Sequence, residues 1–165
     1  MRCMTFADAA EQHLDDVFAY LVYLTGDRAA AEDLAAETFE KALRLWQRFD
    51  ERRGSARSWL CQIARTTALD WFRAERRRRT RENVYALRAV ERPLDDAFGE
   101  GLAPELERAL AALSPAEREV IALRILLELD GPAAARVLGI SATACSTRLS
   151  RALAKLEEEI RDAVA

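Results

Sequence analysis

The segment from residue 130 to residue 153, DGPAAARVLGISATACSTRLSRAL, constrains the fold more than any other part of the sequence. Ala135 stands four residues before Gly139, at a place where a side chain larger than a methyl group would hold two crossing helices apart. Gly139 can adopt the positive φ that a tight corner between helices requires. The spacing therefore predicts a short helix, a turn at Gly139 and a second helix, which together form a helix-turn-helix.

The second predicted helix has a polar face that suits DNA. Ser141 is placed to cap its first turn, and Ala144 or Cys145, Leu149 and Leu153 recur at intervals of three or four residues and can pack inward. The residues left on the outer faces are mostly hydroxylated or basic: Thr143, Ser146, Thr147, Arg148, Ser150 and Arg151. Such groups bind phosphates and base edges, so the segment predicts a helix in the major groove. An ordinary helical hairpin with a solvated face is the alternative that this segment alone leaves open.

The remainder of the chain also has helical periodicity, and no segment has a convincing alternating strand pattern. Helices are predicted over about 7–24, 29–48 and 57–79, and they resume near residue 104. Ser114 and Glu117 flank Pro115 in a pattern typical of a helix start. We therefore predict an all-α protein with two small helical domains, at 7–81 and 104–163, of which the second contains the helix-turn-helix. A flexible acidic linker at 82–103 joins them.

The charge is distributed unevenly, although the net charge is only −3. Residues 73–81 contain six arginines and one glutamate, whereas 93–107 contain five carboxylates and no basic residue. Because salt limits the range of each charge to about 8 to 10 Å, local sign matters more than the total. The arginine cluster therefore predicts a polyanionic partner.

Several classes of function lack sequence support. No apolar run approaches the roughly 20 residues that cross a bilayer, and the first residues lack the apolar stretch of a secretory signal, so we expect a cytoplasmic protein without membrane insertion. Cys3, Cys61 and Cys145 are far apart and His13 is the only histidine, so neither a disulfide framework nor a metal site is expected. There is no glycine-rich phosphate loop and no Ser/His/Asp set. We therefore expect no catalytic residues and no cofactor.

Three blocks of sequence, at 24–43, 53–79 and 113–156, together resemble the extracytoplasmic-function (ECF) sigma factors of the sigma-70 family. The blocks are LTGDRAAAEDLAAETFEKAL, RGSARSWLCQIARTTALDWFRAERRRR and LSPAEREVIALRILLELDGPAAARVLGISATACSTRLSRALAKL. The resemblance covers nearly the whole chain apart from the linker and the ends. It implies a region 2 domain and a region 4 domain that bind RNA polymerase core enzyme and promoter DNA, together with an anti-sigma partner.

The resemblance also implies roles for individual residues. Core polymerase would contact the predicted second helix through Asp33 and Glu37, with Leu34 and Phe39 nearby. The minus-ten element would be read by the loop before the third helix and by that helix, with the candidates Arg57, Ser58, Trp59, Gln62, Arg65, Thr66, Asp70 and Arg73. The minus-thirty-five element would be read by Thr143, Ser146, Thr147, Arg148 and Arg151. Trp59 and Trp71 are expected to serve the core rather than to stack on bases.

The resemblance leads to a transcription initiation factor as the preferred hypothesis, and two other hypotheses remain open. The first is a sigma-like decoy that titrates an anti-sigma protein, because Ala36, Thr66 and the Gly131-Pro132 pair depart from the family pattern. The second is a helix-turn-helix regulator that binds duplex DNA alone, although this would leave the first 80 residues without a role.

Overall fold

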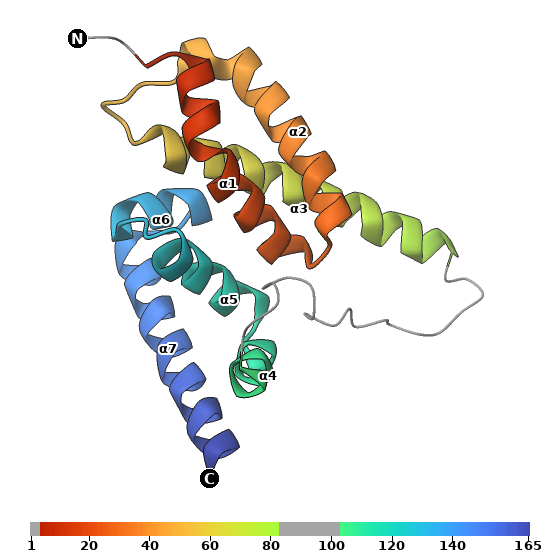
Figure 1. Cartoon of the computed structure of the whole chain (residues 1–165), viewed down its shortest axis with the longest axis vertical. Coiled ribbons are helices and arrows are strands. Elements are labelled where there is room, and N and C mark those ends of the chain that lie inside the picture. Colours follow the sequence, from red (N-terminus) through yellow and green to blue (C-terminus); the bar gives the residue numbers. More distant parts are fainter. Residues whose placement is uncertain (1–3, 83–102) are drawn as a thin grey trace.

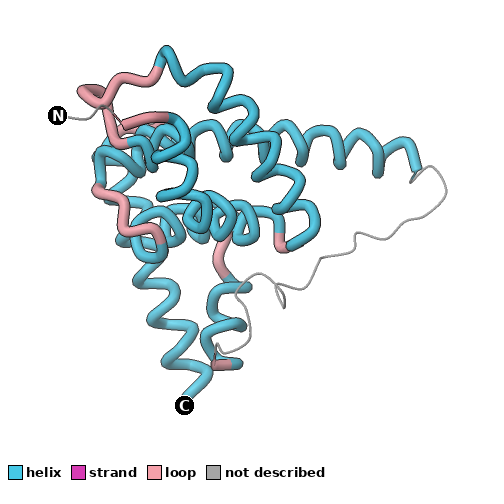
Figure 2. The backbone as a smooth tube through the Cα atoms, turned by 45° about the horizontal axis from the view of Figure 1, so that its top comes forward, coloured by secondary structure: helices cyan, strands magenta, loops and turns pink. Residues whose placement is uncertain are grey.

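The computed structural model describes residues 4–82 and 103–165, and every regular element within these ranges is helical (Figures 1 and 2). In chain order the elements are α1 (Phe6–Thr25), α2 (Arg28–Leu45), the 3-10 turn η1 (Trp46–Arg48), α3 (Ala56–Glu82), α4 (Pro104–Ala112), α5 (Pro115–Ile121), the π-helical turn η3 (Ala122–Leu126), α6 (Gly131–Leu138) and α7 (Ala142–Val164). The all-α prediction is confirmed. The predicted linker lies outside the described residues except at its two ends, residues 82 and 103.

Helices α1, α2 and α3 pack against one another in the first bundle. Local chemistry sets their ends: Thr5 and Asp8 form a capping box at the start of α1, Gly26 ends α1 with a φ of 62°, and Asp27 caps α2. Inside the bundle, apolar residues such as Val17 and Leu21 of α1 and Leu60 of α3 are fully buried. The bundle thus fixes α3, which carries most of the predicted minus-ten residues.

The second bundle is built around α7, against which α4, α5 and α6 pack. The predicted capping box of Ser114 and Glu117 is present at the start of α5. Asp130 caps α6, Gly139 ends it with a φ of 67°, and Ser141 caps α7. The helix-turn-helix of α6 and α7 is therefore formed as predicted.

The two bundles are in contact, which the sequence pattern does not indicate. Helix α3 packs on α6 and α1 contacts η3, and a single cluster of buried residues extends through both bundles. Figure 1 shows α5 and α6 beneath the first bundle, while the end of α3 and the end of α7 project away from the contact. The two domains thus form one closed body in this structure.

Three further features of the described residues concern membranes, metal ions and thiols. Among the described residues, no helix is long and apolar enough to cross a membrane. Over the same ranges, no group of His, Cys, Asp and Glu side chains is arranged to hold a metal ion. Cys61 and Cys145 are free and buried, and burial raises the pKa of the Cys61 thiol to about 12, so this thiol stays protonated.

Candidate nucleic-acid interface

Helix α7 presents a polar outer face in the second bundle. Its start is fixed by the Ser141 hydroxyl, which accepts a hydrogen bond from the backbone N–H of Ala144 at 3.1 Å. All the predicted minus-thirty-five residues lie on this helix. Thr143, Ser146, Thr147 and Arg151 are exposed, and Arg148 is half-buried. The structure therefore places hydroxyl and guanidinium groups together on a helix that is rigidly capped at its first turn.

The inward stripe of α7 differs from the prediction at one position. Cys145 and Ala152 are buried and Leu149 is partly buried, as expected for positions separated by four and seven residues. Leu153 was expected to pack inward, but its side chain is 39% exposed. The prediction for Leu153 is wrong because eight residues beyond Cys145 a helix has turned about 80° past the buried stripe, whereas Ala152 has returned to it.

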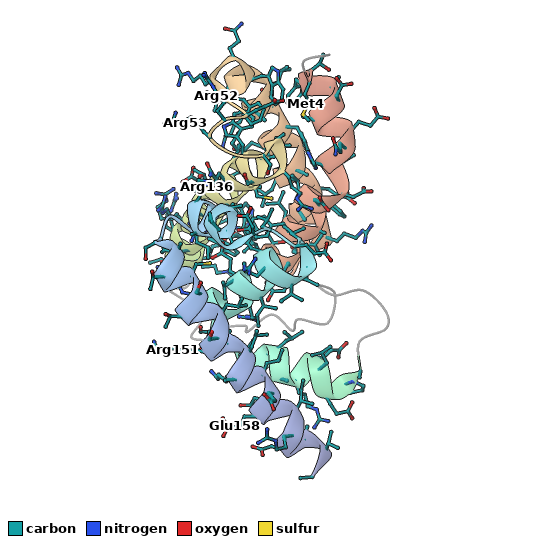
Figure 3. All side chains as sticks on the ribbon, turned by 90° about the vertical axis from the view of Figure 1, so that its left-hand side faces the viewer. Met4, Arg52, Arg53, Arg136, Arg151 and Glu158 are labelled. Carbon is teal, nitrogen blue, oxygen red and sulfur yellow. The ribbon has the colours of Figure 1, made fainter. Side chains whose placement is uncertain are left out.

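A pocket of about 380 Å³ lies beside the start of α3 and touches both bundles. It contains three of the predicted minus-ten residues, Ser58, Trp59 and Gln62. Phe49, Asp50, Arg53 and Gly54 also line it and belong to the loop before α3, which was predicted to take part without naming its residues. Arg48 and Arg136 line it as well and were not predicted. In the view of Figure 3, Arg52, Arg53, Arg136 and Arg151 lie along the same edge of the molecule. Arginines from both bundles therefore lie on the side of the molecule where the pocket is found.

An aromatic cluster supports the wall of this pocket. The rings of Trp46 and Phe49 stack with centroids 4.9 Å apart, and Trp59 contacts both of them. Trp59 thus packs within the cluster, as expected, while also facing the pocket. Ser58 is buried, and its hydroxyl donates to the Ser55 carbonyl at 3.0 Å. These contacts hold the beginning of α3 in a fixed position.

The other five minus-ten candidates are spread along α3 rather than gathered at the pocket. Arg57 pairs with Asp16 at 3.5 Å, and Asp70 and Arg73 pair with each other at 3.0 Å on an exposed face. Thr66 is exposed and its hydroxyl donates to the carbonyl of Gln62. Arg65 is directed away from these groups, toward the second bundle.

Arg65 forms an ion pair with Glu119 of α5, at 2.7 Å between Nε and Oε1. Burial lowers the pKa of the Arg65 guanidinium, but the hydrogen bond and the charge of Glu119 outweigh burial and raise it. The Tyr20 hydroxyl donates to the same carboxylate at 2.7 Å, and burial followed by the charge of Glu119 raises the pKa of Tyr20 well above its usual value. Both partners therefore hold their protons at neutral pH.

The predicted polymerase-binding residues divide between the surface and the core. Asp33 and Glu37 are exposed on one face of α2, and Glu37 pairs with Lys41 at 2.6 Å. Leu34 is buried in the core and Phe39 packs partly against it. The exposed carboxylates can meet basic groups on a partner, whereas Leu34 supports the helix from beneath.

The arginine cluster lies on the last turns of α3, which project beyond the bundle in Figure 1. Arg76, Arg77, Arg79 and Arg81 are exposed, and Arg78 pairs with Glu75 at 2.6 Å. An exposed helix end with this charge can bind nucleic acid backbone without reading its sequence. The cluster therefore forms a second basic surface, separate from α7.

Two family models match the chain in the order that this architecture requires. Sigma-70 region 2 matches residues 9–78, and the sigma-70 region 4 model matches residues 104–156. The ECF RNA polymerase sigma factor SigC of Mycobacterium tuberculosis is 34% identical over 148 residues, which cover 89% of this chain and 77% of SigC. The chain belongs to the ECF family of RNA polymerase sigma factors. Proteins of this family are regulatory rather than catalytic.

A further ECF sigma factor and two solved structures are also similar to this chain. BldN of Streptomyces coelicolor is 34% identical over 95% of this chain, which spans only 61% of BldN. Among solved structures, CnrH in complex with the cytosolic domain of CnrY is 26% identical, with a TM-score of 0.69 over 97% of this chain and 89% of CnrH. The sigma factor RpoE of Bartonella quintana, in complex with the anti-sigma factor NepR, shares the fold with a TM-score of 0.77 over 94% of this chain and 96% of RpoE, at 24% identity.

Proposed function

We propose that this protein is an alternative sigma factor that binds RNA polymerase core enzyme and directs promoter recognition and transcription initiation. The observation that carries the proposal is the presence of both sigma regions in one chain, with a capped helix α7 that exposes Arg151, Thr143 and Thr147 beside half-buried Arg148. A specificity factor of this kind needs surfaces rather than a catalytic site. We therefore assign it no enzymatic activity of its own, and its place of action is the cytoplasm, where the polymerase works.

The proposed division of labour follows the two domains. The domain at 7–81 binds core enzyme through Asp33 and Glu37 of α2 and reads the minus-ten element with α3 and the loop before it. Opening of the promoter takes a base out of the stack, which costs a few kcal/mol, and the pocket beside Trp59 offers the extruded base an aromatic wall and arginines. The domain at 104–163 reads the minus-thirty-five element with α7, and the segment at 82–103 connects the two.

We also infer that an anti-sigma protein regulates this chain. The structural relatives CnrH and RpoE were solved in complexes with CnrY and with the anti-sigma factor NepR. A free sigma factor would redirect transcription, and a protein that covers its polymerase-binding surface would prevent this. Its identity would follow from co-purification with the full-length chain.

Run-off transcription with purified core polymerase tests the proposal directly. A promoter can first be found by sequencing the transcripts that appear on overexpression. We expect initiation at this promoter only when the protein is added. Arg148→Ala should lower initiation by about tenfold or more, because one bidentate arginine–guanine contact discriminates by about 1 to 3 kcal/mol. Arg161→Ala is the matched control, since Arg161 is exposed near the end of the same helix and pairs with Glu157.

The competing hypotheses give different results in this assay. A decoy would bind its anti-sigma protein but would not support initiation with core polymerase. A stand-alone regulator would bind promoter DNA specifically without polymerase, whereas we expect that binding to be weak and strongly salt dependent. Failure of the chain to associate with core polymerase in a pull-down would refute the proposal.

A further inference from the structure

The two domains meet at a buried polar contact centred on Glu119 of α5. This residue belongs to the second domain, and its side chain is 11% exposed. From the first domain, the Tyr20 hydroxyl and Arg65 Nε both donate to Oε1 at 2.7 Å, and Arg65 Nη2 donates to Oε2 at 3.4 Å. Beside this group, the Tyr23 hydroxyl donates to the carbonyl of Arg118 at 2.6 Å. We call these contacts the interdomain latch.

The latch is suited to hold one arrangement of the domains without making it permanent. A buried carboxylate is costly unless its oxygens are hydrogen-bonded, and here the hydrogen-bond donors to Glu119 come from the other domain. The carboxylate oxygens of Glu119 therefore have these protein partners only when the domains are closed. In an open form water would solvate the same groups, so the net gain from a buried ion pair is small and closure remains reversible.

Closure covers the surface that the proposed function assigns to minus-ten DNA. The guanidinium of Arg65 holds both oxygens of Glu119, and these are the same donors that a DNA phosphate would need. In addition, Arg136 of α6 reaches the pocket formed by Ser58, Trp59 and Gln62. A Cβ added at Gly54 would lie 3.2 Å from Nη2 of Arg136, which shows how closely the second domain approaches the loop before α3.

We propose that the closed form is autoinhibited, with Glu119 occupying Arg65 in place of minus-ten DNA, so that single-stranded promoter DNA binds only after the domains separate. The proposal rests on the proposed function, because it assumes that α3 reads the minus-ten element. The apparent affinity for the strand is then reduced by the fraction of molecules that are open. Any partner that binds only the open form relieves the inhibition by shifting this equilibrium.

The test uses the full-length chain and three variants. Glu119→Gln keeps the shape of the side chain but removes its charge, and Tyr20→Phe removes one hydrogen bond without altering Arg65 or any charge. Glu157→Gln is the control, because it makes the same charge change in the second domain at an exposed side chain. Circular dichroism establishes that each variant keeps its helices.

Two measurements are made on each protein: the radius of gyration by small-angle X-ray scattering, and the low-salt affinity for the non-template minus-ten strand of a promoter active in the run-off assay. We expect Glu119→Gln and Tyr20→Phe to expand the molecule. Loss of a hydrogen bond to a charged group shifts such an equilibrium by about tenfold, so the strand should bind up to about tenfold more tightly. Glu157→Gln should behave like the unmodified protein in both measurements.

Three results would overturn the proposal. The first is no change in size or affinity for either latch variant. The second is expansion without tighter binding, which would mean that closure does not compete with DNA. The third is equal tightening by Glu157→Gln, which would reduce the effect to net charge. If the run-off assay succeeds while the latch variants show any of these results, the autoinhibition fails and the sigma function stands.

Discussion

At the scale of single residues, two buried threonines differ in whether the side-chain hydroxyl has a hydrogen-bond partner, and this should decide whether the hydroxyl stabilises the core. Thr67 on α3 is 1% exposed, and its Oγ1 accepts a hydrogen bond from Lys41 Nζ at 3.3 Å. Thr38 on α2 is 0% exposed, and its Oγ1 has no partner among the residues that the structure describes. The two positions are similar in burial, so their difference isolates the cost of an unsatisfied hydroxyl.

We expect Thr38→Val to raise the free energy of unfolding by about 1 kcal/mol, because a buried polar group without a partner carries a desolvation cost that a methyl group lacks. Thr67→Val should lower it by about 1 kcal/mol, since it removes the hydrogen bond that Lys41 Nζ donates to Thr67. Both values can be measured by urea denaturation. A loss of stability in both variants would contradict this account of Thr38.

At the scale of elements, the sequence predicts helix ends best where local chemistry sets them. Ser114, Gly139 and Ser141 act as expected because a cap depends only on residues within one or two turns. The π-helical turn Ala122–Leu126 was not predicted, because the segment has ordinary helical periodicity and the turn forms with tertiary packing. Leu153 was misplaced for a related reason: two positions in α7 fit the spacing, and only packing selects Ala152.

The turn of the helix-turn-helix gives a clean test of backbone conformation. A Cβ added at Gly139 or at Gly131 would meet no atom within 4 Å beyond the adjacent backbone, but only Gly139 has a positive φ, at 67°. We therefore expect Gly139→Ala to lower the free energy of unfolding by about 1 to 2 kcal/mol through backbone strain alone.

The matched change Gly131→Ala should lower this free energy by less, because Gly131 has no positive φ and the remaining cost is the restriction that Pro132 places on a helical residue before it. Thermal and urea unfolding of the two variants would measure both effects. Equal destabilisation by both changes would show that space rather than φ limits the turn.

At the scale of the whole molecule, the sequence pattern indicates two helical domains but not the contact between them. Arg136 lies far along the chain from the other residues that line the pocket, and Glu119 lies far from Arg65. No periodicity in the sequence indicates either of these contacts. The minus-ten candidates on α3 follow from the family resemblance, whereas Arg48, Arg53 and Arg136 become visible only when the loop and the second domain are in place. The contact between the domains depends on how well two folded surfaces fit each other. Hydrophobic periodicity along the sequence does not reveal this fit.

Arginines lie on two separate surfaces of the molecule, and those on each surface should contribute differently to promoter binding. Arg148 lies on the capped helix α7, whereas Arg77 and Arg79 lie on the exposed end of α3. A base contact changes which sequence is preferred, while a phosphate contact changes affinity for all sequences alike. The net charge of −3 does not indicate these basic surfaces, because acidic residues in other parts of the chain offset the arginines in the total.

We therefore expect the double change Arg77→Gln and Arg79→Gln to weaken binding of the polymerase holoenzyme to every promoter sequence. Each lost phosphate contact should reduce the slope of log K against log salt by about 0.9, so the double variant should lose about 2. Binding titrations over a range of KCl concentrations measure this slope. The control is Arg108→Gln with Arg161→Gln, two exposed arginines already paired with glutamates. An equal change of slope in the control would show that the basic end of α3 acts only through net charge, because the control removes the same two charges at distant positions.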